Sequence, residues 1–129
     1  MNNNINPSNY LYTIVMQYPI SVNRYYRTFR NITMISKEGR LFKQKVRQSC
    51  LDVAPSNDNV LLDIVIHPKQ KKDGTAFSQI IDLDNGLKCI LDSLIGIVYH
   101  DDKQVKGLHV NYGASIPNGA TTVLVSKFI

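Results

Sequence analysis

The segment from Ser78 to Ile95 reads SQIIDLDNGLKCILDSLI and changes from a strand pattern to a helix pattern within a few residues. Its first part, about Ser78–Leu83, is rich in isoleucine and leucine, which favours a β-strand. From about Asn85 onward the apolar residues recur at the spacing of one helix face. The apolar positions of that face are Leu87, Ile90, Leu91 and Leu94. A strand followed by an amphipathic helix predicts a helix layer packed on a sheet.

Further strands and a second helix are predicted on both sides of this segment. The strands are Tyr10–Ile20, Asn59–His67, Val105–Tyr112 and Thr121–Phe128. The helix is expected from about Lys37 to Asp52, with Ser36 as its cap. Its apolar positions are Leu41, Phe42, Val46 and Cys50. The stretch Ser21–Arg27 fits neither pattern and is expected to be a loop. The order β-α-β-β-α-β-β predicts a single two-layer α/β (α+β) domain, a mixed β-sheet with two helices packed on it.

The length and composition of the chain favour a single folded domain with a polyanionic partner. The chain has 129 residues, which argues for one domain, placed at residues 10–129 after a flexible N-terminal tail at residues 1–9. Its 15 Lys and Arg residues exceed its 10 Asp and Glu residues, and the net charge of +5 favours a polyanionic partner. Cys50 and Cys89 match neither a zinc site nor a disulfide scaffold and are expected to be reduced thiols. Residues 1–7 lack a basic start and an apolar run, so we expect a cytoplasmic protein that neither is secreted nor spans a membrane.

Acidic residues gather where the predicted strand gives way to the helix. Asp82 and Asp84 are two positions apart, so in a strand their side chains would project from the same side. If Asp84 caps the helix, Lys88 and Asp92 follow one and two turns later, on a face distinct from the leucine stripe. Carboxylates held this close raise one another's pKa unless a cation joins them, and hard oxygen ligands favour Mg²⁺ or Mn²⁺ over zinc. The pattern therefore predicts a divalent metal site.

Each of these residues also has a purely structural interpretation. The pair Asp84–Asn85 could serve only as a helix cap, and Lys88 could form an exposed ion pair with Asp92. The later doublet Asp101–Asp102 could be a solvated turn. Capping and turns alone, however, do not account for the spacing D-x-D-N-x-x-K-x-x-x-D-x-L followed by D-D-x-x-V.

Two motifs occur in order along the chain. The later one consists of Asp82-Leu-Asp84-Asn85, Lys88, Asp92, Leu94, Asp101-Asp102 and Val105. The earlier one is Pro19-Ile-Ser21-Val-Asn23-Arg-Tyr-Tyr26-Arg27. Together they resemble the RusA-type Holliday-junction resolvases, small endonucleases common in phages and prophages, and the earlier motif is similar to that family's P-x-S-x-N-x-x-Y/W-R signature. With the elements between them, the motifs cover about Tyr10 to Tyr112.

The resemblance implies a homodimer that binds four-way DNA junctions and makes paired, symmetric, Mg²⁺-dependent cuts. By motif position, the implied metal-binding acids are Asp82, Asp84 and Asp102. Asp101 is the alternative to Asp102, and Lys88 is the implied catalytic lysine. A dimer also follows from symmetry, since two identical sites related by a twofold axis most simply make two symmetric cuts. The motif residues without an assigned role are Asn23, Tyr26, Asn85 and Asp92.

The chemistry of phosphodiester hydrolysis agrees with this implication. The reaction needs an activated water and compensation of charge on pentacovalent phosphorus, both of which carboxylate-held Mg²⁺ supplies. Lys88 could stabilise the phosphorane, help to orient the water or only relieve repulsion among the acids. Two other functions stay open: a metal-dependent nuclease for other branched or replicative DNA, and a non-catalytic basic DNA-binding protein whose acidic cluster is structural.

Because the predicted site is acidic, basic residues elsewhere must attract the DNA. Three groups are candidates, and each could instead be an ordinary solvated surface. They are Arg24, Arg27 and Arg30 after the first strand, Arg40, Lys43 and Arg47 on one stripe of the first helix, and Lys69, Lys71 and Lys72 in the loop that follows Asn59–His67.

Overall fold

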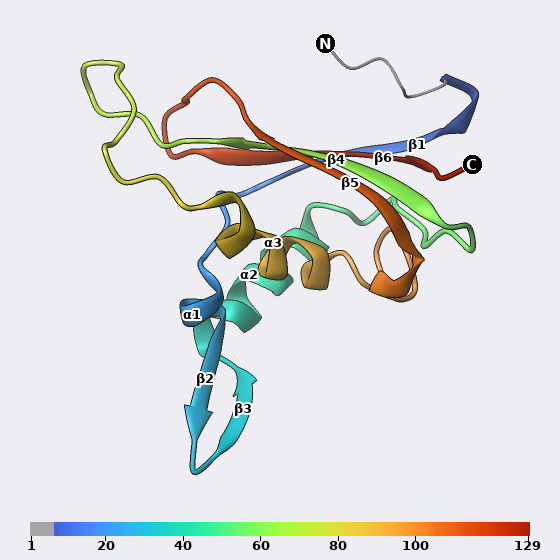
Figure 1. Ribbon diagram of the computed structural model, residues 1–129, viewed down its shortest axis with the longest axis horizontal. Coiled ribbons are helices and arrows are strands. Elements are labelled where there is room, and N and C mark those ends of the chain that lie inside the picture. Colours follow the sequence, from blue (N-terminus) through green and yellow to red (C-terminus); the bar gives the residue numbers. More distant parts are fainter. Residues whose placement is uncertain (1–6) are drawn as a thin grey trace.

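The computed structural model describes residues 7–129 and contains a mixed four-stranded sheet with helices on one face, from which a two-stranded hairpin projects (Figure 1). The strands are β1 (Tyr10–Met16), β2 (Tyr26–Phe29), β3 (Ile32–Ile35), β4 (Val60–His67), β5 (Val105–Tyr112) and β6 (Ala120–Lys127). The helices are α1 (Val22–Tyr25), α2 (Lys37–Gln48) and α3 (Leu83–Ser93), with short 3-10 turns η1 (Pro7–Asn9) and η2 (Asp102–Gln104). The predicted α+β fold with a mixed sheet is confirmed. Of the predicted tail, residues 1–6 lie outside the described residues and the last three form η1.

The sheet has the strand order β1-β6-β4-β5. β4 pairs parallel with β5, from Val60 opposite Val105 to Ile66 opposite Tyr112, and the other neighbours are antiparallel. The path from β4 through α3 to β5 is therefore a β-α-β crossover, in which the helix runs back along the sheet between two parallel strands. As a result, α3 starts at the end of the sheet where β4 and β5 finish, and η2 lies at the opposite end.

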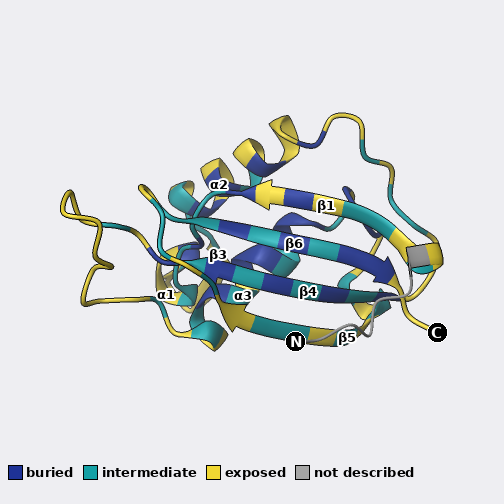
Figure 2. Cartoon of the chain, turned by 90° about the horizontal axis from the view of Figure 1, so that it is seen from above, coloured by how far each residue is buried: buried dark blue, intermediate teal, exposed yellow. Residues whose placement is uncertain are grey.

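The core lies between the sheet and the helices. The alternating residues of β4 that face the helices are fully buried, which Figure 2 shows as dark bands along the strand. They are Val60, Leu62, Ile64 and Ile66. Phe42 and Val46 of α2 and Ile90 of α3 close the core from the other side. Cys50 and Cys89 are both buried and free of disulfides, as predicted. None of the described helices is long and apolar enough to cross a membrane.

Helix α2 begins as predicted but differs at its core face and its end. The Ser36 hydroxyl accepts a hydrogen bond from the Gly39 N–H at 3.0 Å, which caps the first turn. The prediction that Leu41 is buried is wrong, because its side chain is 49% exposed. Gly39 instead lies against the backbone of Tyr25, where an added Cβ would come within 2.6 Å of the Tyr25 carbonyl oxygen. The helix ends at Gln48 rather than near residue 52.

The strand predicted at Ser78–Leu83 is wrong, since residues 78–82 have no regular structure. Tyrosine side chains replace the ladder that a strand would need. The Ile81 N–H donates to Tyr18 Oη at 2.9 Å, and Tyr112 Oη donates to the Ile81 carbonyl oxygen at 2.7 Å. Both main-chain groups of this residue are thus satisfied without a neighbouring strand.

The stretch expected to be a loop, Ser21–Arg27, contains the single turn α1 and the start of β2. β2 and β3 form an antiparallel hairpin that projects from the body of the protein (Figure 1). Its turn residues Arg30 and Asn31 have φ angles of 52° and 65°. Two consecutive residues at positive φ are typical of a tight hairpin turn that matches the twist of the strands.

Candidate active site

Asp82 and Asp84 lie together at the start of α3, on a turn and a helix rather than on the predicted strand. Asp82 is the residue before the helix, with extended φ and ψ angles of −64° and 146°, and Asp84 is in the first turn. The prediction that Asp84 caps the helix is therefore wrong. The Asp82 side chain makes no capping hydrogen bond, and both aspartates are exposed. Two exposed carboxylates at the positive end of a helix dipole are available to an external cation.

A single turn of α3 separates Asp84 from Lys88. Lys88 is exposed and takes part in none of the ion pairs found among residues 7–129. The structural alternative in which it pairs with Asp92 is wrong, since Asp92 Oδ2 lies 3.7 Å from Lys43 Nζ. Asp92 also accepts a hydrogen bond from the hydroxyl of the buried Tyr25. Burial and this hydrogen bond raise the pKa of Tyr25 above its ordinary value. Asp92 thus joins α3 to α1 and α2.

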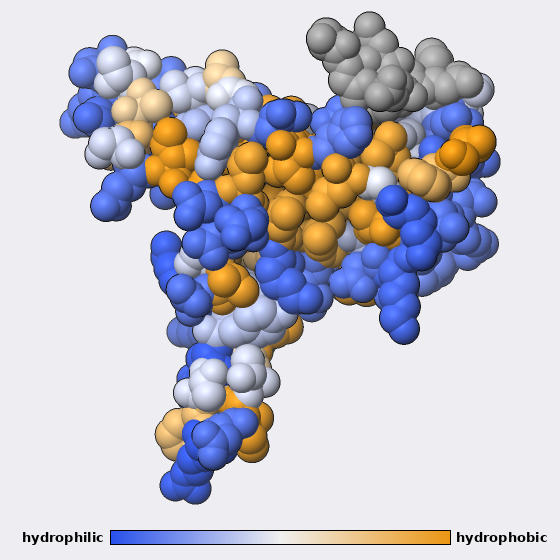
Figure 3. Space-filling view, viewed as in Figure 1, coloured by the Kyte–Doolittle hydropathy of each residue, from blue (hydrophilic) through white to orange (hydrophobic). Residues whose placement is uncertain are grey.

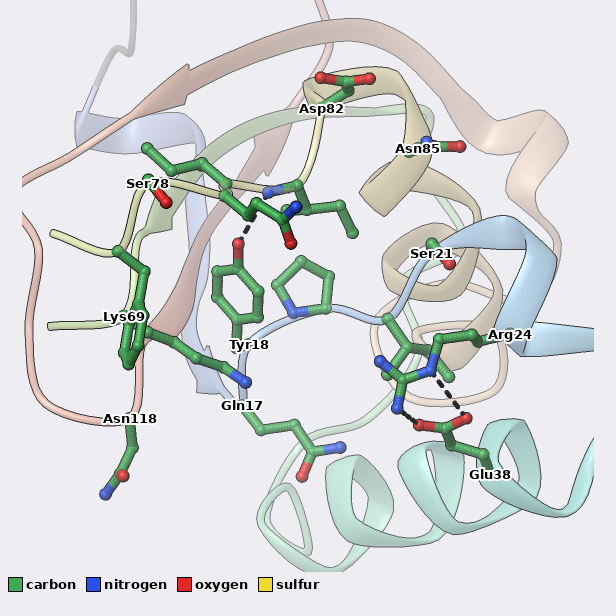
Figure 4. Close-up of a pocket in the computed structure, with 16 residues that line it drawn as sticks. Gln17, Tyr18, Ser21, Arg24, Glu38, Lys69, Ser78, Asp82, Asn85 and Asn118 are labelled. Atoms are coloured by element: carbon green, nitrogen blue, oxygen red, sulfur yellow. Dashed lines mark hydrogen bonds and ion pairs between the residues drawn. The ribbon is translucent and has the colours of Figure 1, made fainter. Parts of the chain in front are cut away.

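An open cavity of about 1090 Å³ lies beside Asp82 (Figure 4). Its wall includes Ser21, Asp82 and Asn85, so residues of both sequence motifs meet there. The two segments come this close because α3 has a glycine at position 86, where an added Cβ would lie 3.0 Å from the Pro19 ring. In Figure 4 the Asp82 carboxylate points away from the other lining side chains. The cavity is open to solvent and is lined by both polar and apolar side chains.

Two tyrosines that the sequence analysis did not select position this end of α3. Tyr18 and Tyr112 hold the main chain of Ile81, the residue before Asp82. Partial desolvation and the nearby negative charges of Asp82 and Asp84 raise the pKa of Tyr112. The unusual number of tyrosines, 7 in the chain, was a signal, but their partners are remote in sequence and could not be inferred.

The later acidic doublet divides into two roles. Asp101 caps η2, because its carboxylate accepts a hydrogen bond from the Lys103 N–H at 2.9 Å. This bond holds the pKa of Asp101 below its usual value. Gln104 completes a capping box by accepting from the Asp101 N–H at 3.1 Å and donating to the carbonyls of Ser56 and Asp58. Asp102, in the first turn of η2, does not cap the turn, and its side chain interacts with that of Asp101, which also lowers the pKa of Asp101.

Asp102 does not join Asp82 and Asp84 within one protomer. Tyr112 ties the start of α3 to the carboxyl end of β5, whereas Asp102 comes just before the amino end of that strand. The eight residues of β5 span about 23 Å at the usual rise per residue. Residues 7–129 accordingly contain no group of three acidic, histidine or cysteine side chains able to hold a metal ion. A single protomer offers two carboxylates at one end of β5 and a third at the other.

The nine candidate DNA-binding residues occur in three places. Arg24 is bound to Glu38, with Nε donating to Oε1 at 3.1 Å, and Lys43 is half-buried beside Asp92. Arg40 donates to the Ile35 carbonyl oxygen at 3.0 Å. The exposed remainder lies on the hairpin (Arg27 and Arg30), at the end of α2 (Arg47) and on the loop after β4 (Lys69, Lys71 and Lys72). The hairpin and the loop lie on either side of the start of α3 (Figure 1).

The sequence of this chain is similar to a known protein family and to a protein of a phage. A family model described as endodeoxyribonuclease RusA matches residues 17–125, which include both motifs, the cavity and the acidic doublet. A protein from Enterobacteria phage HK97, named crossover junction endodeoxyribonuclease rusA, is 30% identical over 121 residues. The similarity covers 90% of this chain and 94% of that relative.

Proposed function

The chain belongs to the RusA family of endodeoxyribonucleases, and from this premise we propose that it resolves four-way DNA junctions by paired, symmetric hydrolysis of phosphodiester bonds. The observation that carries the proposal is the exposed group Asp82, Asp84 and Lys88 at the start of α3, inside the matched segment and beside the large cavity. If the acidic cluster were only structural, its carboxylates would be expected to form helix caps and ion pairs, as those of Asp101 and Asp92 do.

The proposed cofactor is Mg²⁺, for which Mn²⁺ could substitute. Asp82 and Asp84 supply hard oxygen ligands on one turn, and we assign Asp102 rather than Asp101 as the third acid because the carboxylate of Asp101 is engaged as a cap. When bound, such an ion lowers the pKa of water and compensates the charge of the reacting phosphate. The fit is partial within one protomer, since the third acid lies at the other end of β5.

Lys88 is proposed to contact the scissile phosphate. Its ammonium group is exposed, one helical turn from Asp84, and outside the ion pairs of the described chain. A positive charge in this place stabilises the additional negative charge of pentacovalent phosphorus. If Lys88 only relieved repulsion among the acids, Lys88→Met would change the Mg²⁺ concentration at half-maximal rate. A contact with phosphate predicts a lower maximal rate at an unchanged Mg²⁺ requirement, with partial rescue in Lys88→Arg.

The DNA is proposed to approach the start of α3 between the hairpin and the loop after β4. The hairpin and the loop both carry exposed cations. Between them, the group Asp82, Asp84 and Lys88 contributes a single cation, the ammonium of Lys88. Phosphates on either side of the cut would then meet arginine or lysine while the scissile bond faces the carboxylates. We expect the enzyme to act in the cytoplasm on branched DNA.

The test is incubation with a synthetic four-way junction and with a linear duplex of the same sequence, each with and without Mg²⁺. Paired cuts confined to the junction and dependent on Mg²⁺ support the proposal. General nicking of both substrates would favour a nuclease for other DNA, and binding without cleavage would favour a non-catalytic role. Asp82→Asn should fold and bind the junction yet leave it uncut, whereas Asp52→Asn, an exposed acid beyond α2, should cut normally.

A further inference from the structure

We infer that one face of the hairpin β2–β3 contacts nucleobases at the branch point of a four-way junction, where Phe29 stacks on a base that the duplex stack does not cover. The inference rests on the proposed function, since it takes junction DNA as the substrate. It adds to that function a surface that contacts bases and so distinguishes a junction from a linear duplex. This surface is separate from the acidic residues at the start of α3.

The exposed face of the hairpin is mostly apolar and consists of Arg27, Phe29, Ile32 and Met34. These residues share a face because they lie opposite one another or two positions apart in antiparallel strands. Phe29 is 54% exposed, Ile32 61% and Met34 42%. Figure 3 shows apolar residues exposed on this projection, beside the hydrophilic residues at its end. A contiguous apolar surface so far from the core points to a binding partner.

The opposite face of the hairpin holds it to the body of the protein. Tyr26 and Ile35, which lie opposite one another at its base, pack against the buried core. The Tyr26 ring meets the buried Tyr25 ring edge-on, with 5.0 Å between the ring centroids. Just after β3, the Ser36 N–H donates to the Tyr25 carbonyl oxygen at 2.8 Å. The hairpin is therefore fixed at its base, and at the usual rise per residue its tip lies about 10 Å further out.

An arginine lies over one side of the Phe29 ring at this tip. The Arg30 guanidinium carbon is 5.2 Å from the ring centroid, which is close enough for a cation–π interaction. Because the Phe29 side chain is 54% exposed, the ring keeps surface on which a base can stack. Proteins that bind unstacked nucleic acid combine aromatic rings with arginine in this way. The tip thus has the chemistry of a base-stacking platform.

Charge and size favour DNA as the partner of the exposed face. Residues 26–35 include two arginines, Arg27 and Arg30, and no Asp or Glu. A stable protein interface takes roughly 20–30 residues from each side, far more than this face offers. Phosphates bound by the two arginines would bring the adjoining bases to Phe29 and Ile32. The face therefore matches a nucleic acid better than another protein.

The hairpin begins at the cavity beside Asp82. Arg24, two residues before β2, lines that cavity together with Asp82. The reach of the hairpin, about 10 Å, equals the rise of about three base pairs. A phosphate near Asp82 and a base a few pairs away therefore fit on one protein surface. Inserting a side chain into a linear duplex costs unstacking energy, which is lower at a branch point because the stack is interrupted there, so the exposed face favours the junction.

Binding measured without Mg²⁺ tests this face independently of cleavage. The double variant Phe29→Ala, Ile32→Ala should bind the four-way junction on the order of tenfold more weakly, a loss typical of one stacked base. Its binding to a linear duplex and its salt slope should match those of the wild type, because no phosphate contact is removed. Phe29→Tyr keeps the ring and should bind the junction normally. Leu51→Ala, at an 81% exposed position after α2, is the control and should leave both affinities unchanged.

Circular dichroism shows that each variant is folded, as expected for substitutions of exposed side chains. A double variant that binds the junction as tightly as the wild type would overturn the inference and leave the proposed function intact. An equal loss of affinity for junction and duplex would also overturn it, because the hairpin would then contact only the backbone. A change of mass in sedimentation without DNA would show that the face meets another copy of the chain, with the same consequence.

Photocrosslinking locates the contact directly. Iodouracil forms a covalent bond under ultraviolet light with an aromatic side chain that stacks on it. Placed at the branch point, it should crosslink to Phe29, and placed in the middle of an arm it should not. Absence of Phe29 from the crosslinked peptides, or equal crosslinking at both places, would overturn the inference. Should the wild type bind the junction no better than the duplex, the proposed function fails, and iodouracil in an unpaired bulge still decides whether Phe29 stacks on bases.

Discussion

At the scale of single residues, Asp92 belongs to the matched motif but acts in the interior. Its carboxylate accepts a hydrogen bond from Tyr25, which is 0% exposed, and lies near Lys43. Asp92→Ala leaves a buried hydroxyl without an acceptor and should lower the free energy of unfolding by about 1–3 kcal/mol in urea titration. Asp92→Asn keeps an acceptor oxygen and should cost less. Loss of cleavage in a fully folded Asp92→Asn would instead assign this residue to the reaction.

The neighbours Asp101 and Asp102 should separate stability from activity. Asp101→Ala removes the cap of η2 and should lower the thermal unfolding midpoint by a few degrees with cleavage retained. Asp102→Ala should keep the midpoint and abolish cleavage. The stability from Asp101 is present above the pKa of its unfolded form and is lost as pH falls, since the folded pKa is depressed. The opposite result, an inactive Asp101→Ala, would exchange the two assignments.

At the scale of elements, the hairpin β2–β3 is expected to contact DNA phosphates. Arg27 and Arg30 are exposed on it, and the hairpin contains no acidic residue. If each arginine neutralises one phosphate, the double alanine variant should weaken junction binding and reduce the log–log salt slope by about 1.8. Lys127→Ala, at the end of β6 and paired with Asp58 at 3.6 Å, is the control that should keep the slope. An unchanged slope in the arginine variant would exclude the hairpin from the DNA interface.

Elements that bury one regular face were predictable from the sequence. The segment held by tyrosine hydrogen bonds and the exposed hairpin were not. The alternation of β4 predicts its burial because a central strand packs one whole face on the core. Ile81 suggests a strand, but Tyr18 and Tyr112 satisfy its main chain instead. The hairpin has no such alternation, since most of its side chains face solvent. To predict the hairpin, one would need to know which residues of β2 and β3 pair with each other, and the composition does not give that pairing.

The candidate site could be proposed from the sequence as a set of residues, but its arrangement in space could not. The spacing of Asp82, Asp84 and Lys88 identified one exposed turn of α3 correctly as a unit. The motifs group Asp102 with these residues but do not say whether the acids belong to one chain. Within one chain the crossover keeps them apart, because a helix between two parallel strands separates its own start from the start of the next strand. A sequence does not state which strands pair, and the position of the third acid depends on that pairing.

At the scale of the whole molecule, the folded state is expected to lose stability at alkaline pH. Burial raises the pKa of Cys89 to about 12, and burial raises the pKa of Tyr99 as well. A folded pKa above the unfolded value means that the unfolded chain loses its proton first, so stability is full below about pH 9 and declines as pH rises further. Urea midpoints should therefore fall steadily above that pH, and Cys89→Ala should make the decline shallower than in the control Cys50→Ala. A midpoint that stays constant up to pH ~11 would show that these groups ionise as readily folded as unfolded.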